Sequence, residues 1–449
     1  MKPYPKYKPS NIPWIGEIPD HWGIKKVKYF SYLKGRIGFH GLKSSEFIEE
    51  GPYLVTGTDF ENGKINWNSC YHITEERYWE DTHIHLRDGD LLITKDGTIG
   101  KTAIVENKPS RATLNSGVLL IRPTQSVFKT FFFYYCLNSD LFNRQIDFLK
   151  RGTTINHLYQ ETFANFVFIA PSSEEQLLIA AYLDNKTQKI DKLISNKQKQ
   201  IELLKEERQA VINNAVTGKL LPLTKGETQR GFKTTGIPWL GDIPEHWEVK
   251  KLKYITENVQ TGNTPPSTNP EYFFEGDIDW FTPGDFNDSL ILKNANRKIS
   301  ELALKDRVVK LYKPSTVLLI GIGATLGKVG IIENEASSNQ QINAITFDKD
   351  INPYFGLYFL YSISATIVSL SNAATLAILN QSQTKDIPFL TPSLKEQNII
   401  VDFINSEMRR IESVVEKIQK EISLLQEYRK VLISEVVTGK TDIREEIVS

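Results

Sequence analysis

Cysteine is scarce in this chain, which has only Cys70 and Cys136 among its 449 residues. Two thiols cannot form the disulfide framework of a small secreted domain, and the first residues contain no apolar run of the kind that a secretory signal needs. The two most apolar stretches, 128–137 and 317–322, are too short to span a bilayer. We therefore expect a cytoplasmic protein that is not inserted in a membrane.

A net charge is also lacking, because 54 Lys and Arg residues balance 54 Asp and Glu residues. This balance excludes a histone-like basic coat. A nucleic-acid partner would therefore have to bind at a local cluster of Lys and Arg side chains. The hydrophobic content of 40% and the aromatic content of 11% are typical of a folded globular protein. The length is sufficient for two or three domains.

Motifs for nucleotide binding and methyl transfer are missing as well. Residues 97–102, GTIGKT, imitate the end of a phosphate-binding loop, but Lys95 stands where that loop needs its first glycine. The stretches NPEY and NPYF, at 269–272 and 352–355, lack the second proline of the motif on which amino-methyltransferases stack a target base. We therefore predict no catalytic residue in this chain.

The chain contains an internal repeat. The segment IPWIGEIPDHWGIKKVKY at 12–29 returns as IPWLGDIPEHWEVKKLKY at 237–254. Further matched pairs follow in the same order: GTIGKTAIVEN with GATLGKVGIIEN (97–107, 323–334), PSSEEQLLIAAYL with PSLKEQNIIVDFI (171–183, 392–404), and VTGK twice (216–219, 437–440). Such ordered repetition indicates a tandem duplication of one unit.

The repeat argues against a zinc site. Four residues of the first half have a spacing that could hold zinc: Cys70, His72, His83 and His85. The second half has no histidine or cysteine at the matching place, so turn or surface roles are the favoured interpretation. We predict no metal and no cofactor in this chain.

Each half begins as a mixed α/β domain and ends as a long helix. The first part, about 170 residues, is rich in glycine, proline and aromatic residues, with short β-type runs bounded by turn formers. After Pro171 and Pro392 the composition changes to Glu, Gln, Lys, Ile and Leu, and both breaks carry helix-start residues. The predicted fold class is mixed α/β (α+β), with two globular domains and two long helices.

Apolar residues in these helices recur at steps of three and four, which is typical of a coiled coil. The predicted seam consists of Ile190, Ile194, Ile201, Leu204, Val211, Ile411, Val415, Ile418, Ile422, Leu425 and Leu432. Because the second globular domain separates the helices in sequence, we expect them to pair antiparallel, each ~60 Å long, with the halves related by a pseudo-two-fold axis.

Recognition chemistry is present in both halves. The turn with Thr98 and Lys101, and its repeat with Thr325 and Lys328, offers backbone amides, a hydroxyl and an ammonium group to a phosphate oxygen. A purely structural turn is an equally weighted alternative. Amides that could pair with adenine in a major groove follow each turn, although such residues also cap strands: Asn115, Asn339, Gln340 and Gln341.

Other residues in or beside the variable stretches complete the predicted DNA-binding set: Lys34, Arg36, Lys95, Thr261, Asn263 and Thr264. The stretches 30–90 and 255–315 hardly align, whereas the rest of the two halves does. A duplicated scaffold with two different surfaces suggests two different targets. For the IPW segments we favour a packing role over the alternative of a subunit-docking surface; their tryptophans and histidines are Trp14, His21, Trp22, Trp239, His246 and Trp247.

The chain resembles the specificity subunit of type I restriction–modification enzymes, often called HsdS. The likeness covers nearly the whole chain. Its carriers are the two IPW segments, TGNTPPS…EGDIDWFTPGD at 261–285, the GTIGK and GATLGK turns, the P-x-x-x-EQ helix starts and the VTGK ends. One departure is that residues 373–376 read AATL where 152–155 read GTTI, so no DNA contact is carried over to Ala373.

The resemblance implies a non-catalytic subunit that docks modification subunits, in two copies, and a restriction and translocase subunit. S-adenosylmethionine, ATP and magnesium would then bind to those partners. In the family each globular region is a target recognition domain that reads one half of a split sequence in double-stranded DNA. Accordingly, we predict recognition domains at 1–171 and 232–391, helices at 172–222 and 392–441, a linker at 223–231 and a tail at 442–449.

Two alternatives of other classes remain. A coiled-coil adaptor that joins two protein ligands would have the same architecture, and salt-sensitive DNA affinity would discriminate against it. An enzyme with an unrecognised active site is the second alternative, which assays of the isolated chain for methylation or nuclease activity would test.

Overall fold

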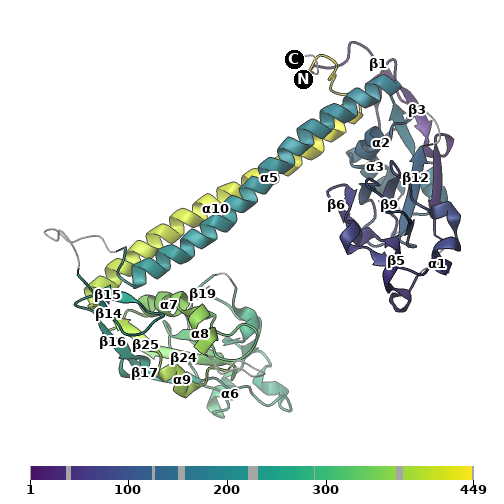
Figure 1. Cartoon of the computed structure of the whole chain (residues 1–449). Helices are drawn as coiled ribbons and strands as arrows, with labels where there is room; N and C mark the ends of the chain where they lie inside the picture. Colours follow the sequence, from purple (N-terminus) through teal and green to yellow (C-terminus); the bar gives the residue numbers. More distant parts are fainter. Residues whose placement is uncertain are drawn as a thin grey trace. The chain divides into compact units, whose positions relative to one another are not determined.

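The computed structural model of the chain describes residues 2–36, 42–123, 127–149, 157–220, 231–287, 289–370 and 378–446 (Figure 1). The chain divides into two compact units, Met1–Gln198 with Gln419–Ser449, and Lys199–Ile418. The stretches 152–155 and 373–376, the linker apart from Gly231, and the last three residues of the tail lie outside the described residues. The domain boundaries stay a prediction.

Unit 1 contains a six-stranded and a three-stranded sheet. The larger sheet has the order β4 (Ser31–Gly35), β12 (Val118–Pro123), β9 (Leu91–Thr94), β10 (Thr102–Ile104), β7 (Lys64–Ile65) and β6 (Phe60–Glu61). The smaller one has the order β11 (Ala112–Leu114), β5 (Ile48–Val55) and β8 (Tyr71–His72). Two short pairs complete the strands: β1 (Tyr7–Pro9) with β2 (Glu17–Pro19), and β3 (Gly23–Lys26) with β13 (Val167–Ala170).

Unit 2 repeats this topology, except that its larger sheet has no counterpart of β6 among the described residues. Its five-stranded sheet has the order β17 (Thr256–Thr261), β24 (Ile342–Phe347), β21 (Val317–Ile320), β22 (Val329–Ile332) and β19 (Ile291–Leu292). Its three-stranded sheet has the order β20 (Lys298–Ile299), β18 (Ile278–Phe281) and β23 (Ala336–Ser338). The short pairs are β14 (Phe232–Thr234) with β15 (Asp242–Pro244), and β16 (Glu248–Lys251) with β25 (Pro388–Thr391).

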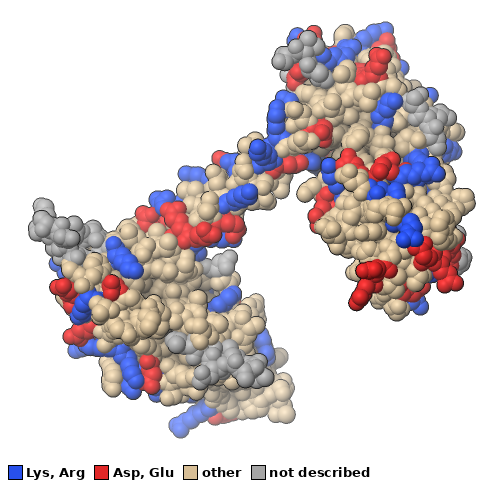
Figure 2. Space-filling view, in the orientation of Figure 1, with Lys and Arg blue, Asp and Glu red and all other residues tan. Residues whose placement is uncertain are grey.

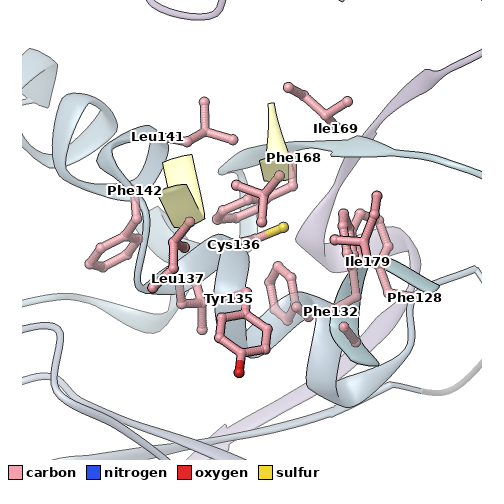
Figure 3. Packing of buried hydrophobic residues seen from close by; sticks show 14 of the residues in the cluster. Phe128, Phe132, Tyr135, Cys136, Leu137, Leu141, Phe142, Phe168, Ile169 and Ile179 are labelled. Atoms are coloured by element: carbon pink, nitrogen blue, oxygen red, sulfur yellow. The ribbon is translucent and has the colours of Figure 1, made fainter. Parts of the chain in front are cut away.

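Short helices cover the sheets in each unit. Unit 1 has α1 (Glu75–Trp79), α2 (Thr130–Leu137), α3 (Asp140–Leu149) and α4 (Gln160–Ala164), and unit 2 has α6 (Glu301–Lys305), α7 (Pro353–Ser362), α8 (Ser364–Leu370) and α9 (Gln381–Lys385). Helix α2, TFFFYYCL, is apolar on nearly all sides because it lies inside the core of unit 1, where Phe132 and Cys136 are fully buried (Figure 3). The predicted mixed α/β class is confirmed.

The two long helices are α5 (Ser173–Val216) and α10 (Leu394–Val437), and they pair antiparallel (Figure 1). In unit 1, Arg429 late in α10 forms an ion pair with Asp191 early in α5, with Nε and Oδ1 3.0 Å apart. In unit 2, Arg410 early in α10 forms an ion pair with Glu207 late in α5. The coiled coil predicted from the heptads is therefore confirmed.

The predicted seam residues line this pair. Ile190, Ile411, Ile418 and Leu432 are buried, and Ile194, Ile201, Leu204, Val211, Val415, Ile422 and Leu425 are half-buried. Half-burial is expected of a two-helix seam, which no third element covers. None of the helices that the structure describes is long and apolar enough to cross a membrane.

Each IPW segment is fastened to the start of its long helix. Trp22 is fully buried and donates its indole Nε1–H to Glu175 Oε2, 3.0 Å away, and Trp247 does the same to Glu396 Oε1 at 3.3 Å. His21 and His246 bond to the same two carboxylates. The packing interpretation of Trp22 and Trp247 is therefore confirmed.

The end of each long helix closes on an IPW segment. Gly439, after α10, has φ +71°, and a Cβ there would stand 2.5 Å from Pro19 and 2.9 Å from Trp22. Gly218, after α5, has φ +78° and meets Pro244 and Trp247 in the same way. In unit 1 a bridge between Lys2 and Asp442 also brings the two ends of the chain together (Figure 1). Both units therefore share the packing of a glycine at the end of a long helix against the proline and tryptophan of an IPW segment.

Candidate nucleic-acid interface

Three turns meet in each unit, and we call this group the three-turn corner. In unit 1 it consists of residues 55–59, 95–101 and 115–117, and in unit 2 of residues 281–285, 321–328 and 339–341. In both units, the first turn follows the central strand of the three-stranded sheet, the second joins the two strands of a hairpin, and the third connects the two sheets. The corner therefore occupies the same place in both units.

Matching backbone hydrogen bonds hold the two corners together. Lys95 N donates to Gly117 O at 2.9 Å, and Gly321 N donates to Gln341 O at 2.8 Å. A second bond joins the other pair of turns: Asn115 N to Val55 O at 2.9 Å, repeated by Asn339 N to Phe281 O at 3.0 Å. The two corners therefore share these backbone hydrogen bonds, although many of their side chains differ.

The Thr-Gly-Lys turn connects β9 to β10 and is repeated between β21 and β22. Buried Thr94 fastens it in unit 1, because its Oγ1 donates to Thr98 O and accepts from Lys101 N at 3.0 Å. Gly100 has φ +95°, and a Cβ there would stand 3.0 Å from Phe142. Gly100 therefore has a structural role, while Lys101 extends into solvent.

The repeated turn has the same form. Gly327 has φ +86°, and a Cβ there would stand 2.7 Å from Ser364 O. Lys328 is exposed and lines a hollow of about 410 Å³ whose other cationic side chains, Lys205 and Arg208, come from α5. The turn of unit 2 thus lies next to basic side chains of the long helix.

The amides of the third turn mostly hold the backbone. Asn115 Oδ1 accepts from Ser116 N at 2.7 Å, and Asn339 Oδ1 accepts from Gln341 N at 3.0 Å. Asn339 is only 7% exposed, and its Nδ2 donates to Gln341 Oε1 at 2.9 Å. Gln340 is exposed, and its Oε1 accepts from Thr264 Oγ1. Gln340 is therefore the exposed amide of the third turn in unit 2.

The first turn was not among the predicted sites. Thr56 donates to Asp59 Oδ2 from its backbone N at 2.7 Å and from Oγ1 at 2.9 Å, and Thr282 repeats both bonds to Asp285 at 2.7 and 2.8 Å. The sequence signal was VTGTDF against FTPGDF, at 55–60 and 281–286. This match lies inside the stretches that otherwise hardly align, which explains why it was missed.

The remaining predicted residues of unit 1 differ in access. Lys34, on β4, and Lys95 are half-buried. Arg36 is 1% exposed, with Nε donating to Leu114 O at 2.9 Å and Nη1 3.6 Å from Glu80 Oε2. Burial lowers the pKa of Arg36. The position of Arg36 argues for a structural role and gives no support to a surface contact.

In unit 2 the predicted threonines and asparagine lie beside the corner. Thr261 donates from Oγ1 to Asn343 Oδ1 at 2.8 Å, and the Asn263 backbone N donates to Ser338 O at 3.0 Å. The side chains of Asn263 and Thr264 are exposed. These two residues thus extend the exposed surface of the corner.

The charged side chains of the surface are mixed in sign. Figure 2 shows Lys and Arg side chains interspersed with Asp and Glu side chains on the face in view, without a continuous basic band. Among the described residues, no group of His, Cys, Asp or Glu has the arrangement of a metal site. His72 and His85 instead bond to the carbonyls of Gly51 and Tyr78, both at 2.8 Å. The two three-turn corners therefore offer two surfaces for recognition.

The family model described as the type I restriction modification DNA specificity domain matches the chain twice, over residues 38–203 and 244–424. The chain belongs to this family. It is thus a specificity subunit of the HsdS type with two DNA recognition domains, and the resemblance drawn from its motifs is confirmed.

Two curated specificity subunits are similar to this chain over most of their length. The type I restriction enzyme MjaVIII specificity subunit of Methanocaldococcus jannaschii is 28% identical, with 95% of this chain and 94% of the relative covered. The EcoBI specificity subunit of Escherichia coli is 26% identical, with 96% and 88% covered.

Solved structures support the fold. A chain from a study of complex assembly and conformational transition in the type I R-M system has a TM-score of 0.70 at 15% identity, with 94% of this chain and 99% of that chain covered. The HsdS subunit from Thermoanaerobacter tengcongensis has a TM-score of 0.53 at 16% identity, with 94% and 98% covered.

Proposed function

We propose that this specificity subunit binds double-stranded DNA at a bipartite, asymmetric site and that each unit reads one half. The observation that supports this is the pair of three-turn corners, which are held by matching backbone hydrogen bonds and carry different side chains. A protein that recognises two different DNA sequences with two copies of one scaffold needs this combination. The backbone fixes how the duplex approaches, and the side chains select the bases.

Each corner combines the two kinds of group that DNA recognition uses. The ammonium groups of Lys101 and Lys328 are exposed and suit phosphate oxygens, which position a duplex without reading it. Polar side chains around them, such as Gln340 and Asn263 in unit 2, suit base edges in the major groove. The hollow shared by Lys328, Lys205 and Arg208 extends the basic surface from the corner to α5.

The long helices act as the spacer in this proposal. Two helices of 44 residues, each ~66 Å long at 1.5 Å per residue, form a rod that sets how many base pairs separate the half-sites. With a DNA turn of ~34 Å, the half-site centres are about one turn or slightly more apart. The base pairs between the half-sites are not read.

The same proposal assigns DNA methylation and cleavage to partner subunits. The chain docks two modification subunits and a restriction subunit, which carry S-adenosylmethionine, ATP and magnesium, and it acts with them in the cytoplasm. This division is supported by the missing catalytic motifs in the sequence, and by the family's description as a DNA specificity domain.

The test is methylome sequencing of cells that express the neighbouring modification subunit with and without this chain. The proposal expects a methylated sequence with two unequal halves and an unread middle, present only with the chain. A methylome that does not depend on the chain would overturn the proposal and favour a protein-joining adaptor.

A further inference from the structure

A matched β-bridge lies beside each three-turn corner. In unit 1 the bridge joins Asp96 to His157, and in unit 2 it joins Ile322 to Ile378. Equal backbone bonds flank the two bridges: Leu158 N donates to Lys95 O, and Leu379 N to Gly321 O, both at 2.8 Å. The two side-chain pairs therefore occupy one structural position in the repeat.

The chemistry at this position is opposite in the two units. In unit 1, His157 Nδ1 bonds to Asp96 Oδ1, and these side chains are 32% and 41% exposed. In unit 2, Ile322 is half-buried and Ile378 is 40% exposed. The same position of the repeat thus carries a polar pair in unit 1 and an apolar pair in unit 2.

The apolar pair is continuous with the recognition surface of unit 2. Ile322 directly follows Gly321, whose backbone N joins the second turn of the corner to the third, and Gln341 Nε2 donates to Ile322 O at 3.4 Å. A ligand that reaches Lys328, on the same turn as Ile322, and Gln340, on the third turn, would also meet this pair.

DNA offers one aliphatic group in the major groove, the 5-methyl group of thymine. An exposed isoleucine at a DNA-reading corner gains free energy by covering that methyl group, whereas it can form no hydrogen bond to the edge of any other base. We propose that Ile378, supported by Ile322, reads a thymine methyl group in the half-site of unit 2. This inference rests on the proposed function and adds the base chemistry to it.

The experiment compares thymine with deoxyuridine, which lacks only the 5-methyl group. The full-length chain with its modification subunits is titrated with duplexes that carry its methylated sequence, and each thymine of the unit 2 half-site is replaced in turn. Assignment of that half-site comes from methylomes of Gln340→Ala, an exposed residue of unit 2. Salt is held constant, because phosphate contacts make affinity salt-dependent.

We expect one replacement to weaken binding by about fourfold, the value of one buried methyl group. The Ile378→Ala variant should bind the thymine duplex about fourfold more weakly than the unchanged chain does, with no further loss of affinity when deoxyuridine replaces thymine. Ile378→Val should still bind the deoxyuridine duplex more weakly than the thymine duplex. Replacements in the half-site of unit 1 serve as the control, because Ile378→Ala should not change their effect.

Three results would overturn the inference: no thymine in either strand of the unit 2 half-site, no sensitive position there, or a sensitivity that Ile378→Ala leaves intact. Each of these is separable from a failure of the proposed function, which would appear as equal affinity for the methylated sequence and for a scrambled duplex. In that case both proposals fall.

Discussion

Trp22 donates its indole N–H to the carboxylate of Glu175, 3.0 Å away, at the first turn of the long helix α5. Tyr4 and His21 bond to the same carboxylate at 2.7 and 3.1 Å, and the group is buried. One side chain therefore fastens the N-terminal segment, the IPW segment and the coiled coil of unit 1 to one another.

Glu175→Ala should lower the free energy of unfolding by roughly 2–3 kcal/mol, because it leaves buried donors without an acceptor. Urea denaturation of the full chain measures this. The control is Glu174→Ala, at the exposed neighbouring position of the same helix start. If the two substitutions lower the free energy of unfolding equally, Glu175 stabilises the chain only through its negative charge at the helix N-terminus.

Glu396, the counterpart in unit 2, predicts a dependence on pH. Burial raises its pKa, but hydrogen bonds from His246, Ser393 and Trp247 outweigh this and leave the pKa below its ordinary value. A carboxyl group with a lowered pKa stabilises the fold above its unfolded pKa, about 4.3, and this contribution is lost as the pH falls through the folded pKa.

Glu396→Gln should therefore destabilise the chain more at pH 7 than at pH 3.5. Urea denaturation of both proteins at the two pH values measures the difference, with Glu416→Gln on the exposed face of α10 as the control. A Glu396→Gln deficit that stays constant between the two pH values would contradict the account.

Gly439→Ala tests the closure of the repeat. Its φ of +71° is shared by Gly236, around which no atom would lie within 4 Å of a Cβ, whereas a Cβ on Gly439 would clash with Pro19 and Trp22. Both substitutions strain the backbone, so the additional cost of Gly439→Ala, expected to exceed about 1 kcal/mol, reports the packing. Equal melting temperatures for the two variants would mean that the helix end does not need this contact.

Shortening the coiled coil should change the spacing between half-sites and nothing else. Removing residues 198–204 from α5 and 414–420 from α10 takes one heptad from each helix and keeps the seam in register. Seven residues correspond to ~10 Å, or about three base pairs at 3.4 Å each. Methylome sequencing measures the result, and altered half-site sequences with an unchanged middle would refute the spacer role.

The sequence predicted those parts of the fold that depend on local pattern. Proline followed by Glu-Gln marked the starts of α5 and α10, and the heptads marked the face on which Ile190 and Ile411 are buried. The repeat then extended each assignment from one unit to the other. Both features are visible because they recur at short or fixed intervals along the chain.

The roles of individual side chains at the corners could not be predicted in the same way. Arg36 was placed in the predicted DNA-binding set, but it is buried and donates to Leu114 O, far along the chain. For Asn339 the sequence left pairing with adenine and a capping role both open, and only the structure shows that its side chain holds its own turn. The Thr56–Asp59 turn escaped notice because only two of its four residues, the threonine and the aspartate, recur at matching places.

The central claim is that each three-turn corner reads one half-site, and reciprocal exchange of the third turn tests it most directly. One variant carries Gln340→Ser with Gln341→Gly, and the other carries Ser116→Gln with Gly117→Gln, so that each unit receives the turn of the other. Methylomes of cells expressing each variant with the modification subunit should show a change in one half-site only, a different half for each variant, with the spacer unchanged. A single variant that alters both halves, or two variants that both retain the original methylated sequence, would contradict the account.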